Sequence, residues 1–197
     1  IRLGIFGCFA FVCLEPSENR PRISMNHIAS LLTLDCIELD SDITSRKRAF
    51  EQISLIVEHC AGISHQVVFD ALNARERLGS TCLGGGVAIP HGRIEGLDAL
   101  ALAVLRTKES IAFDTPDNRR ARLFFAVMIP KDDPDKYLDV LSEISELLKD
   151  REVKQKLLSL ETPLEFCQFI GSWTPPVPEP QAASEEDYPK EDDTPQA

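Results

Sequence analysis

Residues 79–96 read GSTCLGGGVAIPHGRIEG and contain six glycines and one proline. Such glycine-rich stretches form turns and loops, and loops carry function more often than core residues do. We therefore expect this stretch to be mostly turn or loop around one short strand, Val87–Ile89. His91 is the residue of chemical interest, because Pro90 stiffens the backbone before it and Gly92 leaves little side-chain bulk after it.

Two helices are predicted before this stretch. In the first, apolar residues follow the i, i+3, i+4 rule after the cap residue Ser45, and Gly62 ends the helix. The second begins at Ser64 and ends at Gly79. Its polar end, residues 73–77, therefore comes directly before the glycine-rich stretch.

Strands and helices are also predicted after the stretch. Two apolar runs, Ala99–Leu105 and Leu123–Ile129, are near-continuous, which indicates strands covered on both faces. Helices are expected from Asp133 and Pro134, which suit an N-cap and a first turn, and from Thr162, which opens a capping box. This alternation predicts an α/β fold, a single domain with a central mixed β-sheet flanked by helices.

The length of the chain favours one domain with additional terminal segments. Its 197 residues, 43% of them hydrophobic, suffice for one core and are too few for two full domains. We expect the folded domain to span residues 25–172. Residues 1–24 are interpreted as an upstream extension, with a secretory signal peptide as the alternative. Residues 173–197 are rich in proline and acidic side chains and are expected to be disordered.

The charge and the cysteines narrow the function classes. The formal net charge is -11, from 32 acidic and 21 basic residues, so the positive footprint of a nucleic-acid binder is missing. The six cysteines form no CxxC pair, which favours reduced thiols in a cytoplasmic protein. The apolar segment at the start is too short to span a bilayer, so no membrane insertion is expected.

The residues around His91 resemble a known active-site signature. Residues 75–81 read RERLGST and residues 84–92 read GGGVAIPHG. Together they resemble the signature of the fructose/mannitol-type IIA family of bacterial phosphotransferase systems, and the resemblance covers roughly residues 28–170. Within the family, the nitrogen-regulatory branch is most similar. The resemblance implies the mannitol/fructose-type IIA fold, with His91 as the residue phosphorylated by an HPr-like phosphocarrier.

The resemblance also implies roles for residues near His91. Arg75 matches a family arginine whose guanidinium binds two phosphoryl oxygens, the alternative being a solvated charge at a helix end. Ser80 and Thr81 match a serine–threonine pair whose hydroxyls bind phosphate or satisfy the turn. A glycine loop can also offer backbone N–H groups to phosphate. The candidates for that cradle are Gly84, Gly85 and Gly86.

Tyr137 departs from the family pattern. Many sugar-type members have a second active-site histidine at this point, and a phenol cannot carry its positive charge. His91 is still able to accept phosphate, but the rate of onward transfer is put in question. A regulatory protein tolerates slower transfer better than a sugar transporter does, so Tyr137 favours the regulatory branch.

Three functions are consistent with these residues. The first is a regulatory phosphotransferase component whose two phosphorylation states bind protein targets differently, with potassium-transport machinery or sensor kinases as the targets that the family suggests. The second is a IIA component of fructose or mannitol uptake that passes its phosphoryl group to a IIB protein. The third is a binding module that keeps the fold without phosphorylation.

No cofactor is required by any of these functions, and no metal site is predicted. His91 has no Cys, His, Asp or Glu at a common ligand spacing. The other histidines lack an i+4 partner of ligand type, so we expect them to be surface or packed residues. They are His27, His59 and His65.

Overall fold

The structure is a computed structural model that describes residues 26–113, 115, 117–131 and 136–174. The predicted upstream extension lies outside these residues, as does the predicted tail from residue 175 onward. The predicted start of a helix at Asp133 and Pro134 also lies outside them. The expected domain boundaries therefore stay predictions.

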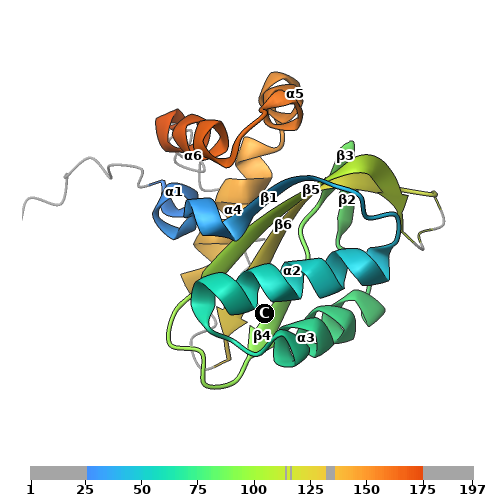
Figure 1. Ribbon diagram of the computed structural model, residues 1–197, viewed down its shortest axis with the longest axis vertical. Helices are drawn as coiled ribbons and strands as arrows, with labels where there is room; N and C mark the ends of the chain where they lie inside the picture. The colour runs from blue at the N-terminus through green and yellow to red at the C-terminus, as the bar shows by residue number, and fades with distance from the viewer. Residues whose placement is uncertain (1–25, 114, 116, 132–135, 175–197) are drawn as a thin grey trace, which may run out of the picture.

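The described residues form helices at both ends of the domain and a run of five consecutive strands, β2 to β6, between them, with β1 between the first helices (Figure 1). In chain order they are α1 (His27–Leu31), the 3-10 helix η1 (Leu34–Cys36), β1 (Ile37–Ser41), α2 (Arg46–Ala61), α3 (His65–Arg77), β2 (Cys82–Gly84), β3 (Gly86–Ala88), β4 (His91–Ile94), β5 (Ala101–Ala112), β6 (Arg120–Pro130), α4 (Lys136–Leu147), α5 (Arg151–Ser159) and α6 (Pro163–Ser172).

The strands form one mixed sheet in the order β1-β5-β6-β3-β2. β5 and β6 are antiparallel, whereas β1 runs parallel to β5. β3 and β4 follow one another along the same side of β6, both parallel to it, so β4 is an edge strand. Helices α2 and α3 cover one face of the sheet, and α1, α4, α5 and α6 cover the other (Figure 1). The predicted α/β fold with a central mixed sheet is confirmed.

Strand β6 shows why the apolar runs are continuous. Its side chains alternate between two cores, one under α4 to α6 and one under α2 and α3. The first core takes Leu123, Phe125, Val127 and Ile129, and the second takes Phe124, Ala126 and Met128. The prediction of strands covered on both faces is confirmed. Both strands extend beyond the apolar runs, because Ile111 and Ala112 of β5 still pair with Ala121 and Arg120 of β6.

The glycine-rich stretch differs from the expectation of one short strand. It contains three strands, β2, β3 and β4. Its backbone groups pair with one another and with the edge of β6 that does not pair with β5. Strand β1 and helix α5 also had no sequence prediction. The helix ends were predicted better: Ser45 caps α2, Gly62 ends it at a φ of 69°, and Thr162 opens a complete capping box at α6.

The two ends of the described fold lie side by side. The side-chain amide of Asn26 donates to the carbonyl oxygens of Ile170 at 2.5 Å and Trp173 at 2.9 Å. Its side-chain oxygen also accepts from the backbone of Ala29, which caps α1. One residue therefore joins the first helix to the end of the last one.

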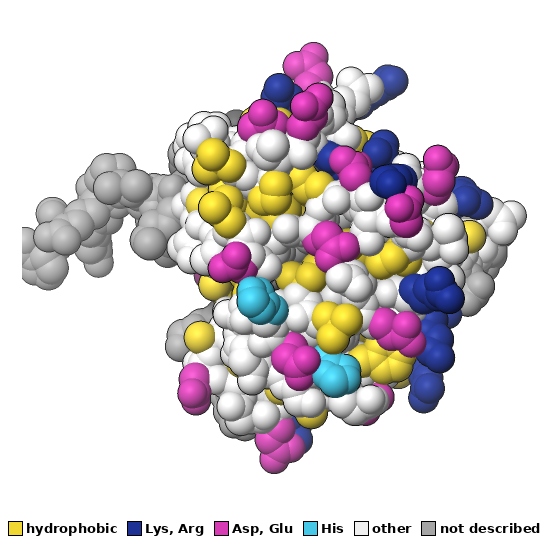
Figure 2. Space-filling view, in the orientation of Figure 1, with side chains coloured by type: hydrophobic (Ala, Val, Ile, Leu, Met, Phe, Trp, Pro, Cys, Tyr) yellow, Lys and Arg dark blue, Asp and Glu magenta, His cyan; other side chains and the backbone are white. Residues whose placement is uncertain are grey.

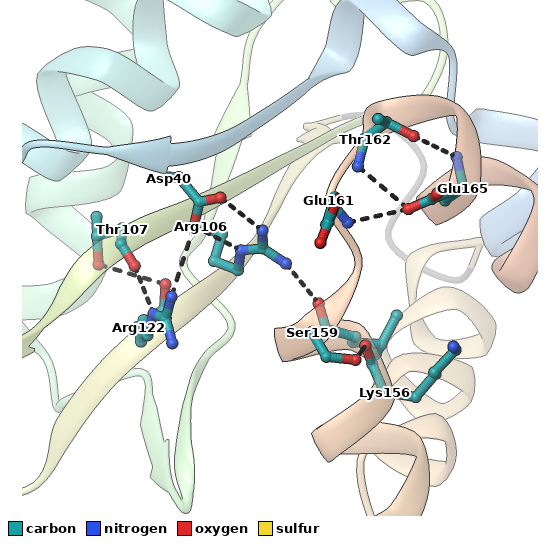
Figure 3. A network of polar contacts seen from close by, with 10 residues as sticks. Asp40, Arg106, Thr107, Arg122, Lys156, Ser159, Glu161, Thr162 and Glu165 are labelled. Atoms are coloured by element: carbon teal, nitrogen blue, oxygen red, sulfur yellow. Dashed lines mark hydrogen bonds and ion pairs between the residues drawn. The ribbon is translucent and has the colours of Figure 1, made fainter.

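A polar network anchors α5 to the sheet (Figure 3). Arg106 of β5 is 2% exposed and donates to both carboxylate oxygens of Asp40, at 3.2 and 2.9 Å, and to the carbonyl of Leu157 at 3.0 Å. Arg122 lies 3.5 Å from Asp40 as well. The hydrogen bond from Arg106 is the main reason that the pKa of the Asp40 carboxyl lies below its usual value.

Replacing Asp40 by asparagine should lower the free energy of unfolding by about 2 kcal/mol, because the buried Arg106 loses its ionised partner. The loss stays below that of a fully buried pair since the Asp40 side chain is 44% exposed. Urea unfolding measures it. The matched control is Asp42→Asn, whose pair with Lys108 is exposed on both sides and should matter little. Equal losses in the two variants would contradict the prediction.

Candidate functional site

His91 lies at the edge of the sheet where the two helical layers approach each other. It is the first residue of β4 and lines a hollow of about 470 Å³ between α3 and the start of α4. Apolar and basic side chains share the lining. They are Ala71, Ala74 and Arg75 of α3, Leu78 directly after α3, His91, Gly92 and Arg93 of β4, Ile129 of β6 and Tyr137 of α4.

The two ring nitrogens of His91 have different partners. Nδ1 lies 2.9 Å from the carbonyl oxygen of Ile89, to which it can only donate. Nε2 accepts a hydrogen bond of 2.9 Å from Nε of Arg75. These contacts assign the proton to Nδ1 and leave the lone pair on Nε2, beside the guanidinium.

The surroundings keep the ring of His91 neutral. Burial is the main cause that lowers its pKa from the usual 6.5, and the positive charges of Arg75 and Arg93 lower it further. The Ile89 carbonyl and Glu76 act in the opposite direction and only partly offset the effect. At neutral pH Nε2 therefore carries no proton and keeps its lone pair, which accepts the hydrogen bond from Arg75.

Arg75 is fixed at both ends of its guanidinium group. While Nε donates to His91, Nη1 donates to the carbonyl oxygen of Gly79 at 2.9 Å. The structure thus brings Arg75 and His91 together, as the sequence interpretation expects. A solvated charge at a helix end does not describe this geometry.

Gly92 permits the close approach of α3 to β4 that makes this contact possible. A Cβ at Gly92 would lie 2.9 Å from the Cβ of Ala71 and 3.0 Å from its carbonyl carbon. Ala71 stands one helical turn before Arg75, so the two share a face of α3. The sequence interpretation treated Gly92 only as a residue of low bulk. Nothing in the sequence indicates which helix it faces.

Thr81 and Ser80 shape the loop that leads to His91. The backbone N–H and the hydroxyl of Thr81 donate to Oε2 of the buried Glu76, at 2.9 and 2.6 Å, and its carbonyl accepts from the N–H of Ile89. The exposed Ser80 accepts from the N–H of Cys82 at 3.2 Å. Of the two roles weighed for this pair, these contacts serve the turn, and the hydroxyl hydrogen of Thr81 is already used.

The three consecutive glycines do not reach His91. β3 pairs Gly86 with Ala121, whereas β4 pairs His91 with Val127, near the other end of β6. Gly86 and His91 are five residue-to-residue steps apart, which span roughly 17 Å in extended chain. The predicted phosphate cradle is therefore corrected. Gly84, Gly85 and Gly86, with φ values of 84°, 63° and 86°, instead make the tight turn between β2 and β3.

Tyr137 does reach the site, and Arg93 reaches it with no sequence prediction. Nη2 of Arg93 donates to the Tyr137 hydroxyl at 3.3 Å, and its guanidinium carbon lies 5.7 Å from the ring centre. Residues i and i+2 of a strand share a face, so recognising β4 as a strand would have paired Arg93 with His91.

Of the remaining histidines, the exposed His59 lies in the last turn of α2, and the other two pair with carboxylates. His27 lies 3.4 Å from the buried Glu143, and His65 pairs with Glu58 at 3.0 Å on the surface.

Within the ranges that the structure describes, no three His, Cys, Asp or Glu side chains are grouped to hold a metal ion, and no helix is long and apolar enough to cross a membrane. In Figure 2, acidic and basic side chains are interspersed, and Lys and Arg gather at the edge beyond the start of α2.

Comparison with known proteins identifies the family. The profile described as phosphoenolpyruvate-dependent sugar phosphotransferase system, EIIA 2, matches residues 30–173. The chain belongs to this family. It is therefore a phosphotransferase-system component, and the EIIA 2 profile confirms the resemblance drawn from the motif around His91.

Relatives and solved structures of the EIIA 2 family support this assignment. The nitrogen regulatory protein of Klebsiella oxytoca is 35% identical over 144 residues, which are 73% of this chain and 89% of that protein. The crystal structure of nitrogen regulatory protein IIA-Ntr from Neisseria meningitidis matches with a TM-score of 0.69 and 37% identity, over 73% of this chain and 99% of that one. The IIA mannitol structure from Escherichia coli (TM-score 0.61, 19% identity, 71% and 98% covered) shares the fold.

Substituting alanine for Gly92 should force α3 away from β4, lower the free energy of unfolding by about 1–3 kcal/mol and slow any reaction that needs Arg75 at His91. Urea unfolding and the rate of phosphoryl acceptance measure the two effects. Gly171→Ala in α6 is the control, because a Cβ there meets nothing within 4 Å. A Gly92 variant as stable and as reactive as the control would refute the packing argument.

The pKa of His91 should lie below 6.5 and should rise when Arg75 is replaced by glutamine, because the imidazolium then loses a repelling charge. Titration of the His91 ring signals by NMR measures both values. Arg77→Gln removes an equal charge from the exposed side of the same helix and should shift the pKa less. The argument fails if both variants shift the pKa equally.

Proposed function

We propose that this chain is a regulatory phosphoryl carrier of the nitrogen branch of the phosphotransferase system. His91 accepts a phosphoryl group at Nε2 from an HPr-like phosphocarrier in the cytoplasm, and the phosphorylation state then regulates partner proteins. The observation that carries the proposal is the hydrogen bond from Nδ1 to Ile89, which leaves the Nε2 lone pair facing Arg75 and the hollow. The similarity to nitrogen regulatory proteins supports the choice of branch.

The geometry suits acceptance of a phosphoryl group by Nε2. The bond between phosphorus and the carrier breaks as the new bond to Nε2 of His91 forms, and no proton has to leave His91 during this step. The Nδ1–H bond to Ile89 stabilises the positive charge that the ring gains when Nε2 binds phosphorus. Ile89 is itself held in place, because its backbone N–H donates to the carbonyl oxygen of Thr81.

Arg75 has two roles in the proposed transfer. In the free protein its Nε–H occupies the Nε2 lone pair, so it marks the place where the phosphoryl group arrives. When phosphorus takes that lone pair, the donor turns to a phosphoryl oxygen, while the bond to Gly79 keeps the guanidinium nearby. Positive groups placed in advance lower the barrier by stabilising charge on the equatorial oxygens.

Arg93 supplies what Tyr137 lacks. Many sugar-type family members have a second histidine at this point, whereas this chain has a phenol, which cannot carry a positive charge. The guanidinium of Arg93 lies over that phenol and lines the same hollow, so a second cation is still present. The phenol positions it through the contact to the Tyr137 hydroxyl.

Partner proteins would distinguish the two phosphorylation states by the charge at this site. Phosphorylation adds nearly two negative charges to a hollow that contains two arginines. Leu78, which lines the hollow directly after α3, is 86% exposed, and Leu138, which follows Tyr137 in α4, is 55% exposed. Apolar side chains with arginine nearby are typical of protein interfaces. Potassium-transport machinery and sensor kinases are the partner classes that we propose to test.

Sugar uptake is the second candidate, because the EIIA 2 family description names sugar phosphotransferase. In that case a IIB protein removes the phosphoryl group from His91 and passes it to fructose or mannitol. The two candidates use the same acceptor atom. They differ in what consumes the phosphoryl group.

Incubation with phosphoenolpyruvate, enzyme I and the HPr-like carrier of the nitrogen branch should add the mass of one phosphoryl group to the protein and none to His91→Ala. Intact-mass analysis under non-acidic conditions measures this. His59→Ala is the matched control and should still be phosphorylated. Faster acceptance from the sugar-branch carrier, with loss to IIB when sugar is added, would favour the second candidate. No added mass with either carrier would favour a binding module without phosphorylation.

A further inference from the structure

A second hollow lies on the other side of α3 from His91. It measures about 540 Å³ and is formed where the start of α2, the end of α3 and the end of β5 meet. Successive residues of a helix point in directions about 100° apart, so one turn of α3 can serve both hollows. Arg75 lines the hollow at His91, whereas Glu76 and Arg77 line the second one.

The carboxyl group of Glu76 is only half used. Its side chain is 6% exposed and belongs to the lining of this second hollow. Oε2 accepts hydrogen bonds from the N–H and the hydroxyl of Thr81, whereas the buried Oε1 accepts none from the residues that the structure describes. Nη1 of Arg46 lies 3.9 Å from Oε1, which is beyond hydrogen-bonding distance. A buried acceptor without a hydrogen bond is unfavourable, so Oε1 favours a ligand that brings a donor.

The start of α2 attracts anions from another wall of the same hollow. The first N–H groups of a helix have no partner within the helix, and they carry a partial positive charge. The first turn of α2 has no acidic residue to balance that charge, and Arg46 and Lys47 stand there instead. Lys47 makes an exposed pair with Glu51 at 3.8 Å, which is worth little. Phosphate groups bind at helix starts of this kind.

The side chains around the hollow carry a surplus of two positive charges. Three of the described residues that line it are cationic and one is acidic: Arg46, Lys47, Arg77 and Glu76. Arg46 is already held, since its guanidinium carbon lies 5.9 Å from the ring centre of Phe113. A phosphate ester carries nearly two negative charges at neutral pH and so matches the surplus, whereas a zwitterionic amino acid carries no net charge.

We propose that this hollow binds a small phosphate ester that also carries a hydroxyl group. The phosphate lies at the start of α2 with Arg46, Lys47 and Arg77 around it, where a guanidinium can bind two of its oxygens. The hydroxyl group donates to Oε1 of Glu76. A volume of about 540 Å³ accommodates a ligand of this size.

Arg46 is the side chain that moves when the ligand binds. Because Oε1 of Glu76 is buried in the free protein, a hydroxyl group reaches it only after a neighbouring side chain turns away. The guanidinium of Arg46 lies 3.9 Å from Oε1, and its side chain is 32% exposed. Turning toward the phosphate exchanges a long ion pair for a direct one. Inorganic phosphate brings no separate hydroxyl group, so near Oε1 it meets the carboxyl with its own charge.

Glu76 connects this hollow to the site at His91. Its Oε2 holds Thr81, whose carbonyl oxygen accepts from the N–H of Ile89, and the carbonyl of Ile89 holds Nδ1 of His91. A ligand on Oε1 therefore acts on the first residue of this series. Binding should shift the amide NMR signals of Thr81 and Ile89, and unchanged signals would remove the connection. The ligand site itself does not depend on phosphorylation of His91, so the two proposals are tested separately.

Isothermal titration calorimetry of the full, unphosphorylated chain tests the site with ribose phosphate, glycerol phosphate, inorganic phosphate and ribose. At least one ester should bind at a single site, about 10-fold more tightly than inorganic phosphate, and ribose should not bind. Lys47→Gln and Arg77→Gln should each weaken ester binding about 10-fold, because each removes a charge-assisted hydrogen bond. Arg93→Gln is the matched control, because it removes an equal charge from the hollow at His91 and should leave the affinity unchanged.

Three results would overturn the proposal. The first is no saturable binding of either ester. The second is inorganic phosphate binding as tightly as the esters, which would mean that no hydroxyl group reaches Glu76. The third is a loss of affinity in Arg93→Gln that equals or exceeds the losses in Lys47→Gln and Arg77→Gln, because the phosphate would then not lie at the start of α2.

Discussion

The contact between Gly92 and Ala71 is the constraint on which the site depends. A helix packs so closely on the edge strand β4 that no side chain fits between them. Arg75, one turn further along the helix, thereby reaches Nε2 of His91. Hydrogen bonds to His91 and Gly79 hold the guanidinium in place, so the contact is already formed in the free protein.

A second constraint runs through the backbone. Glu76 binds Thr81, Thr81 binds the N–H of Ile89, and the carbonyl of Ile89 binds Nδ1 of His91. This series of hydrogen bonds starts next to Arg75 in the sequence and ends at the ring that Arg75 contacts. Two neighbouring residues of α3 therefore set the site: Glu76 fixes the tautomer of His91 through this series, and Arg75 places a positive charge at its ring.

Much of the fold could be predicted because its signals are local. Continuous apolar runs marked the two central strands, and cap residues such as Ser45 and Thr162 marked helix starts. Strand β4 was missed because four residues containing one glycine carry no periodic pattern, and its partner β6 is distant in the sequence. Arg93 was missed with it.

The site residues also divide into those that the sequence could place together and those that it could not. Arg75 and His91 share a motif, so the sequence links them, and the structure joins them by a hydrogen bond. The glycines at 84–86 belong to the same motif, yet the pairing of Gly86 with Ala121 places their turn near the other end of β6 from His91. A motif gives residue types in order along the chain, whereas proximity depends on strand register, which a sequence does not state.

The bonds of Asn26 to Ile170 and Trp173 have a consequence for how this domain can be combined with others. The chain enters and leaves the fold at one corner, so a host protein could carry the whole domain as an insertion in a surface loop without opening the sheet. The fold is in this sense a cassette. The attachment point belongs to α1 and α6, which do not line the hollow at His91.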